Sequence, residues 1–308
     1  MKKIPSFSIK LLSPRYWLGW IAIIILWIFV LLPYPLIEKI GKSFGRASMM
    51  FLRKRRKVAE RNLQLCFPHL TSFERNDLLI SNFESVGMGI METGMAWFWP
   101  DWRVRKWFSI TGYEHMQNAL DSKKGVLLIG MHFLTLELGA RIFGILNSGI
   151  GVYRPNNNAL LDWLQTWGRM RSNKTMLDRS DLKGMLKSLS RGEILWYAPD
   201  HDYGPKNSVF APFFAVKQAA TTTGSYMLIR STQPAVIPFV PRRRHDGGGY
   251  ELIIMPDISA NMPIHSKQET AAYINKSIED AVLLSPDQYM WLHRRFKTRP
   301  EGVHERYK

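Results

Sequence analysis

The chain has 308 residues, of which 46% are hydrophobic, so it can bury a sizeable core and does not belong to the disordered class. Its 42 lysines and arginines against 25 aspartates and glutamates give a formal net charge of +17. That charge favours nucleic acid, an anionic lipid surface or an acidic protein as the partner. The single cysteine, Cys66, excludes an internal disulfide, and its apolar neighbours predict a buried structural thiol.

A long uncharged segment, residues 16–37, lies between Arg15 and Glu38. At about 1.5 Å per residue, a helix of this length reaches roughly 33 Å, which suffices to cross a hydrocarbon core of about 30 Å. No small-residue cleavage site follows it, so we expect a membrane anchor and not a signal peptide. Two alternatives stay open. One is a buried core helix, and the other is a helix inserted shallowly in one leaflet, since Pro33 and Pro35 end the apolar run.

Basic residues flank this segment on both sides. Four precede it and eight follow it up to residue 57, five of them in the cluster at 53–57. Because lysine and arginine are enriched on the cytoplasmic side, the pattern predicts a single-pass protein whose body faces the cytoplasm. The 53–57 cluster is expected to attract anionic headgroups. We therefore divide the chain into a basic flank at 1–15, a membrane anchor at 16–37 and a globular domain at 38–308.

Strands and helices alternate through the rest of the chain. Thr71 and Glu74 form a predicted capping box that opens a helix to about residue 97. Short apolar runs predict strands at 125–131, 150–154, 193–199, 235–241 and 250–255. Amphipathic spacing predicts further helices at 133–146, 159–170, 180–189, 221–230 and 268–284. This order indicates an α/β fold with a mixed sheet.

The junction GVLLIGMHFLTLE at 125–137 places a histidine where a predicted strand meets a predicted helix. Ligands of α/β sheets bind beyond the carboxyl ends of strands, and His132 falls there. A helix N-terminus disfavours a protonated imidazole, so we expect a neutral His132 that can accept a proton. Glu137 could hold the other ring nitrogen and fix the tautomer. The alternative is a structural histidine and an unrelated surface glutamate.

Other catalytic motifs are missing from the sequence. It contains no G-x-G-x-x-G, no P-loop, no HExxH and no G-x-S-x-G. Asp200, His201 and Asp202 could suggest a metal site, but they are adjacent in sequence and no further ligands are evident. We expect neither a metal nor a cofactor.

The run HFLTLELGAR at 132–141 resembles the H-x4-D/E motif of glycerolipid acyltransferases, in the form found in the lipid A late acyltransferases. Further segments look like those of the lauroyl and palmitoleoyl transferases of lipid A synthesis, in order along nearly the whole chain: SPRYWLGW, 82–101, GVYRPNNN, WGRMRSNK, WYAPDHDYG, FAPFFAV, IPFVP and QYMWLHRRFKTRPEG. The resemblance implies a single glycerolipid-acyltransferase-like domain behind one N-terminal transmembrane helix. It also implies that His132 and Glu137 are catalytic.

The resemblance further implies acyl transfer from acyl-carrier protein to a hydroxyacyl hydroxyl of the Kdo-bearing, tetra-acylated lipid A precursor, at the bacterial inner membrane. His132 would be the general base and Glu137 its orienter. No cysteine or serine is placed to form an acyl-enzyme, so a ternary complex is expected. A basic protein suits an acidic carrier protein and a phosphorylated acceptor. Residues 151–190 look more like the lauroyl enzymes, which favours a saturated chain of twelve to fourteen carbons.

Four more residues are predicted to bind substrate. Arg154, Arg169 and Arg171 could pair with phosphate through the planar guanidinium fork, and Arg169 is the best placed by resemblance. Asp200 closes a predicted strand and could hold Arg169 or contact the acceptor. For each of these residues a purely structural role is the alternative.

Three other functions compete with this one. A membrane-tethered nucleic-acid binder is suggested by the clusters at 53–57 and 242–244, but the nucleic-acid motifs are missing and we expect no such partner. A non-catalytic protein that binds anionic lipid could use the same scaffold. An acyltransferase acting on a glycerophospholipid or another glycolipid is the third.

Overall fold

The computed structural model describes residues 5–307. Its centre is a seven-stranded sheet in the order β1-β9-β8-β2-β5-β3-β4. The strands are β1 (Phe108–Thr111), β2 (Val126–Ile129), β3 (Ile150–Tyr153), β4 (Thr175–Asp178), β5 (Ile194–Tyr197), β8 (Ala235–Arg243) and β9 (Tyr250–Ile254). All neighbouring strands pair in parallel except β8 and β9, which are antiparallel. The predicted α/β fold with a mixed sheet is confirmed.

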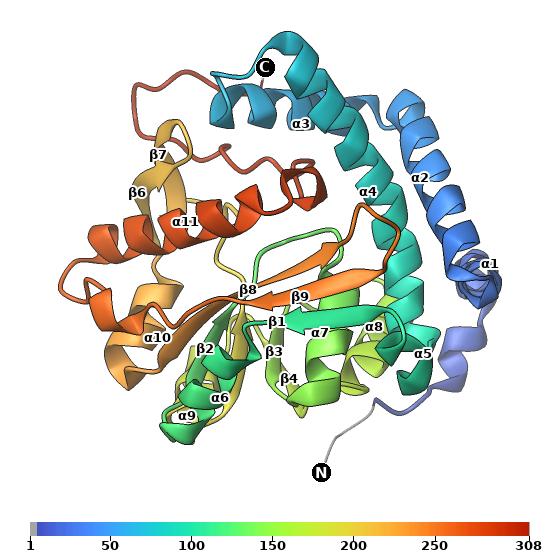
Figure 1. Cartoon of the computed structure of the whole chain (residues 1–308), viewed down its shortest axis with the longest axis horizontal. Helices are drawn as coiled ribbons and strands as arrows, with labels where there is room; N and C mark the ends of the chain where they lie inside the picture. Colours follow the sequence, from blue (N-terminus) through green and yellow to red (C-terminus); the bar gives the residue numbers. More distant parts are fainter. Residues whose placement is uncertain (1–4, 308) are drawn as a thin grey trace.

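Helices cover both faces of this sheet (Figure 1). They are α1 (Trp17–Leu31), α2 (Tyr34–Phe51), α3 (Arg53–Cys66), α4 (Ser72–Phe98), α5 (Asp101–Arg105), α6 (Tyr113–Asp121), α7 (Leu136–Leu146), α8 (Ala159–Met170), α9 (Leu182–Ser190), α10 (Gly224–Thr232) and α11 (Lys267–Leu283). The long helix α4 runs past one end of the sheet with α2 beside it, and α1 is seen nearly end-on at the foot of α2 (Figure 1).

The central strand β2 shows how the core is built. All four of its residues are buried, and alternate side chains enter two different apolar clusters. Leu127 and Ile129 join the cluster that includes Cys66 and the inner side of α11, whereas Val126 and Leu128 join the cluster beneath α7. A strand buried on both faces reads as a continuous apolar run, which is why the sequence predicted it. Cys66 is 2% exposed, as expected for a structural thiol.

Most predicted elements are present with small shifts in their ends. The Thr71–Glu74 capping box is confirmed, since the Thr71 hydroxyl accepts from the Glu74 amide at 3.2 Å and the Glu74 carboxylate accepts from the Thr71 amide at 2.7 Å. The predicted helix at 221–230 was wrong at its start. Residues Val216–Thr222 form β7, which pairs with β6 (Ser208–Phe213) in a separate hairpin, and α10 begins only at Gly224. Pairing with β6 overrides the helical spacing there.

The N-terminal apolar segment is two helices and not one. α1 ends at Leu31, and α2 begins at Tyr34 on the far side of Pro33. Proline restricts the residue before it to extended conformations, and this breaks the run of 22 uncharged residues. Within residues 5–307, one segment, Pro14–Leu31, is long and apolar enough to cross a membrane by length and composition.

Candidate active site

The pairing of β2 with β5 places two polar residues next to each other. The parallel register aligns Ile129 with Tyr197, and the Gly130 amide donates to the Tyr197 carbonyl at 2.9 Å. His132 and Asp200 each lie three residues beyond this last pair. Both therefore leave the carboxyl edge of the sheet at the same point, which is where ligands bind in α/β folds.

Asp200 holds His132 through the ring and through the backbone. Its Oδ1 lies 2.7 Å from His132 Nδ1, and its Oδ2 accepts from the His132 amide at 2.9 Å. The Tyr289 hydroxyl also donates to Oδ2 at 2.9 Å. The Asp200 side chain is fully buried, whereas the His132 side chain is 26% exposed. A buried carboxylate therefore holds the Nδ1 edge of a solvent-accessible imidazole and leaves Nε2 for a substrate.

The Asp200 carboxyl stays ionised in this environment. Burial alone would raise its pKa, but the neighbouring His132 and the hydrogen bonds from that residue outweigh burial and hold the pKa of Asp200 well below its ordinary value. An ionised carboxylate at Nδ1 favours the tautomer with its proton on Nδ1 and stabilises the ring when Nε2 is protonated.

Two further histidines stack on His132. The His201 ring lies 3.4 Å from the His132 ring, centroid to centroid, with 11° between their planes. The His293 ring lies 4.0 Å from the His201 ring at 13°. Burial is the main cause that lowers the pKa of His201 far below its usual range and the pKa of His293 to about 4, with His132 adding to both. These outer rings are therefore neutral at pH 7.

The side chains of His132, Asp200 and His201 bring their ligand atoms within 4.8 Å of one another, which is close enough to suggest a cation. Imidazole binds metals through a lone pair in the plane of its ring. Because the two rings are stacked and nearly parallel, their lone pairs point side by side instead of converging on one ion. This ring arrangement does not fit a shared metal, so we propose none.

Glu137 does not hold His132, and this prediction was wrong. The Glu137 carboxylate pairs with Arg169, whose Nε donates to its two oxygens at 3.0 and 3.2 Å and whose Nη2 donates to Oε1 as well. Asp200 does not hold Arg169 either, because Arg169 pairs with Glu137 and Asp200 pairs with His132. α7 begins only at Leu136, because Phe133 pairs with Tyr289 in an isolated β-bridge. Glu137 thus faces α8 from the first turn of α7.

The late start of α7 also removes the argument that the helix N-terminus keeps His132 neutral. The favourable or unfavourable effect of a helix dipole falls off within the first turn, and His132 lies four residues before Leu136. The His132 carbonyl instead accepts from the Met290 amide at 3.0 Å. The loop that bears the histidine is therefore held by the C-terminal segment.

The other predicted phosphate ligands are less well placed. The Arg171 guanidinium donates to the carbonyls of Trp97 and Trp99, so its fork holds the end of α4. Burial lowers the pKa of Arg171. Arg154 is exposed immediately after β3, at the same carboxyl edge of the sheet as His132. Of the three predicted arginines, Arg171 is thus the one whose guanidinium binds main-chain carbonyls of another helix end.

The basic cluster at 242–244 does not form a free patch for nucleic acid. Arg243 is 4% exposed and pairs with the buried Glu92 at 2.6 Å, and Arg242 pairs with Glu251 at 2.6 Å. Arg244 pairs with Asp246 at 2.6 Å. The formal charge of this cluster is thus compensated within the fold.

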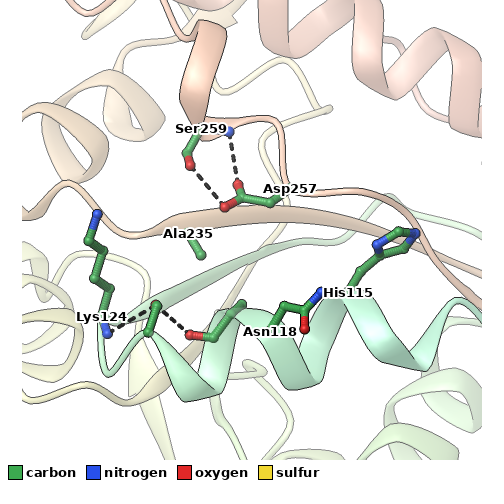
Figure 2. A pocket seen from close by; sticks show the side chains of 8 residues that line it. His115, Asn118, Lys124, Ala235, Asp257 and Ser259 are labelled. Atoms are coloured by element: carbon green, nitrogen blue, oxygen red, sulfur yellow. Dashed lines mark hydrogen bonds between the residues drawn. The ribbon is translucent and has the colours of Figure 1, made fainter.

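A cavity of roughly 200 Å³ lies near the amino ends of β2 and β8, at the opposite end of the sheet from His132. Figure 2 shows the residues that line it. It is next to α6 and includes Ala235 at the start of β8. Its carboxylate, Asp257, accepts from the Val236 amide at 2.9 Å, the Ser259 amide at 2.8 Å and the Ser259 hydroxyl at 2.9 Å. These bonds staple a loop, so Asp257 has a structural role.

Comparison with known proteins decides the family. The sequence model described as bacterial lipid A biosynthesis acyltransferase matches residues 4–298. The chain belongs to this family. It is 58% identical over 307 residues to the lipid A biosynthesis lauroyltransferase of Escherichia coli (strain K12), with 100% of both chains covered. It is 47% identical over 302 residues to the lipid A biosynthesis palmitoleoyltransferase of the same strain, with 98% of both covered.

A lipid A biosynthesis acyltransferase of Haemophilus influenzae is 50% identical over 303 residues, covering 97% of this chain and 96% of the relative. The protein is thus an acyltransferase of lipid A biosynthesis, and the His132–Asp200 pair is its candidate catalytic centre. The stacking of His201 and His293 on His132 was not predicted. His201 was considered from the sequence only as a possible metal ligand, although its position directly after Asp200 could have placed it beside His132, whereas His293 joins the stack from a segment 92 residues further along the chain.

Proposed function

We propose that this acyltransferase moves a lauroyl chain, or a saturated chain of twelve to fourteen carbons, from acyl-carrier protein to a hydroxyacyl hydroxyl of the Kdo-bearing, tetra-acylated lipid A precursor. The higher identity to the lauroyltransferase, 58% against 47% for the palmitoleoyltransferase, supports the choice of chain. The observation that carries the chemistry is the partly exposed imidazole of His132, held at Nδ1 by a buried carboxylate.

His132 is the proposed general base. Its Nε2 takes the proton of the acceptor hydroxyl, and the hydroxyl oxygen attacks the carbonyl carbon of the thioester donor. When the tetrahedral intermediate collapses, the carbon–sulfur bond breaks and the thiolate takes the proton from Nε2. The products are an ester and a free thiol, and the imidazole returns to its starting state. Cys66 is buried in the core, so direct transfer between the two bound substrates fits better than an acyl-cysteine.

Asp200 is the proposed orienter of His132, in place of Glu137. Two bonds to one residue fix both the ring and the loop that bears it. The negative charge also stabilises the imidazolium that forms while the proton resides on Nε2. Stacking of His201 restricts rotation of the ring about its bond to Cβ. The hydroxyl and Nε2 can then meet within about 3 Å, as proton transfer requires.

Glu137 and Arg169 form the proposed site for an anionic group of the acceptor. Glu137 binds Nε and Nη2 along one edge of the guanidinium, so Nη1 is left for a phosphate oxygen. The two side chains are 16% and 20% exposed, a setting in which an oriented charge keeps more of its strength than at an open surface. Arg154 is a second candidate at the same edge of the sheet.

The proposed location is the cytoplasmic face of the bacterial inner membrane. The basic cluster at 53–57 lies on exposed positions at the start of α3 and would add affinity for an anionic surface. Arg55 in this cluster donates to the Leu292 carbonyl at 3.3 Å, next to His293 of the stack. An acidic carrier protein that approaches His132 from this side would meet the same positive charge.

Mass spectrometry of lipid A tests the function. A strain that lacks its lauroyltransferase would be complemented with this chain or with its His132→Ala variant. We expect the intact chain to raise the mass of the tetra-acylated precursor by one saturated acyl chain of twelve to fourteen carbons. The His132→Ala variant should leave the mass of the precursor unchanged. An added palmitoleoyl mass would overturn the chain length, and an unchanged precursor with the intact chain would overturn the acceptor.

A further inference from the structure

One flank of the molecule carries an apolar helix, α1, whose outer side is largely exposed. α1 contains no charged side chain, and its outer residues are 45–80% exposed. They are Trp17, Leu18, Ile21, Ile24, Ile25, Trp27, Ile28 and Leu31. A helix that is apolar all round belongs in a protein core or in a membrane. The outer half of α1 therefore requires a lipid surface.

The inner side of α1 packs on the body along the whole helix. Trp20, Ile23, Leu26 and Val30 recur every three or four residues and are partly or fully buried. Near the end of α1, Gly94 of α4 permits close contact, since a Cβ there would lie 2.8 Å from Leu26 and 2.9 Å from Val30.

The first turns of α1 pack on α8. A Cβ on Gly19 would lie 2.9 Å from Leu160, and the Trp20 and Trp163 rings are 6.2 Å apart. The segment before α1 continues this contact. The Phe7 ring is 5.2 Å from the Trp163 ring, and the Trp163 indole donates to the Pro5 carbonyl at 3.2 Å.

Hydrogen bonds also tie the far end of α1 to the body. The Trp99 indole donates to the Val30 carbonyl at 2.6 Å, and Arg103 donates to the Leu32 carbonyl at 2.5 Å. Both ends of α1 are thus fixed to the domain that bears His132. A spanning helix, in contrast, has its two ends on opposite sides of the bilayer.

We infer that α1 lies along one leaflet and does not cross the bilayer, so that residues 5–16 are on the same side as the active site. A spanning α1 would have to draw α8 and α5 into the hydrocarbon with it, and α5 exposes Asp101 and Arg105. With its axis in the plane of the membrane, α1 would bury its outer half about 5–10 Å into the boundary between headgroups and acyl chains. This inference rests on the proposed location at the membrane.

The in-plane arrangement gives α8 a role in substrate access. Leu160 near the start of α8 contacts α1, and Arg169 lies nine residues further, about 14 Å along the helix. An anchor buried in the leaflet at one end of α8 would place Arg169 at the level of the headgroups. An acceptor lipid could then present its phosphate to Arg169 while its chains stay in the leaflet.

Cysteine labelling of the full-length protein tests the side of the N-terminus. Cys66 is buried, so the exposed Ser6→Cys and, as the cytoplasmic control, Ser43→Cys on α2 would each offer one reactive thiol. We expect a membrane-impermeant maleimide to label neither cysteine in intact spheroplasts and to label both cysteines after the spheroplasts are lysed. Labelling of Ser6→Cys in intact spheroplasts would overturn the inference.

Spin labels at Leu18→Cys, Ile24→Cys and Leu31→Cys test the depth in vesicles of mixed zwitterionic and anionic phospholipid. In one leaflet the three depths should agree to within a few ångströms. A crossing helix would place the middle label roughly 10 Å deeper than the outer two, which would overturn the inference. Transferase activity of each variant is measured separately, so a failure of the proposed reaction is distinguishable from a failure of the topology.

Discussion

Asp200 binds the imidazole and the backbone amide of His132 at once, at 2.7 and 2.9 Å. One side chain therefore sets both the direction of the ring and the course of the loop after β2. The motif H-x4-E predicted that Glu137 orients His132, but Glu137 lies in the next helix and binds Arg169. In the proposed mechanism the two carboxylates have different tasks, one towards the base and one towards the anionic part of the acceptor, and their substitutions should differ accordingly.

Asp200→Asn should lower kcat by about a hundred- to ten-thousand-fold, because an amide can retain the shape but not the charge that fixes the tautomer of His132. The measurement is the steady-state rate of acyl transfer with purified protein. Asp257→Asn is the matched control, since Asp257 also holds a loop through backbone amides but lies at the other end of the sheet. If both variants lost the same modest fraction of activity, Asp200 would be only a structural staple.

Arg169→Ala should raise KM for the acceptor more than Arg169→Lys does, because lysine keeps the charge but loses the planar fork. The effect of Arg169→Ala on KM should be smaller with a monophosphorylated acceptor that lacks the phosphate bound by Arg169. Glu137→Gln should act through Arg169, so adding it to Arg169→Ala should cost little more. A mutational loss that is the same with every acceptor would show that Arg169 does not bind phosphate.

His201→Phe should retain most of the activity, since a flat ring can replace the stack on His132 at 3.4 Å. His201→Ala removes the ring and should lower kcat roughly ten-fold or more, because a misoriented base reacts slowly. The comparison is made on kcat, with the melting temperature Tm as a check on folding. Equal rates in the two variants would show that the stack has no part in positioning His132.

The partly buried His293 should make the fold less stable in mild acid. Burial, with His132 adding to it, lowers the pKa of His293 from 6.5 to about 4. Between these values the unfolded chain binds a proton that the folded chain does not, so the free energy of unfolding falls as pH falls. His293→Asn should reduce the drop in Tm between pH 7 and pH 5, measured in detergent. An unchanged drop would mean that His293 does not remain neutral in the folded protein.

Local sequence patterns predict individual helices, strands and caps but not which strands are neighbours. The strand predicted at 125–131 and found at 126–129, the helix at 159–170 and the capping box at Thr71 follow from local patterns, and the structure confirms them. The partner of His132 depends on which strands are neighbours, which no local pattern contains. Once β5 lies beside β2, Asp200 takes the place at Nδ1 that the H-x4-E spacing suggested for Glu137. The hairpin of β6 and β7 was missed for the same reason, because pairing and not propensity decides it.

The central claim is that His132 removes the proton of the acceptor hydroxyl. The most direct test is the single-turnover rate of acyl transfer by purified His132→Ala, with acyl-carrier protein as donor and the Kdo-bearing precursor as acceptor, beside the Tm of the same sample. We expect a Tm close to that of the unmodified protein and a rate lower by about a hundred- to ten-thousand-fold. A folded His132→Ala protein that transfers the acyl chain at nearly the full rate would contradict the mechanism.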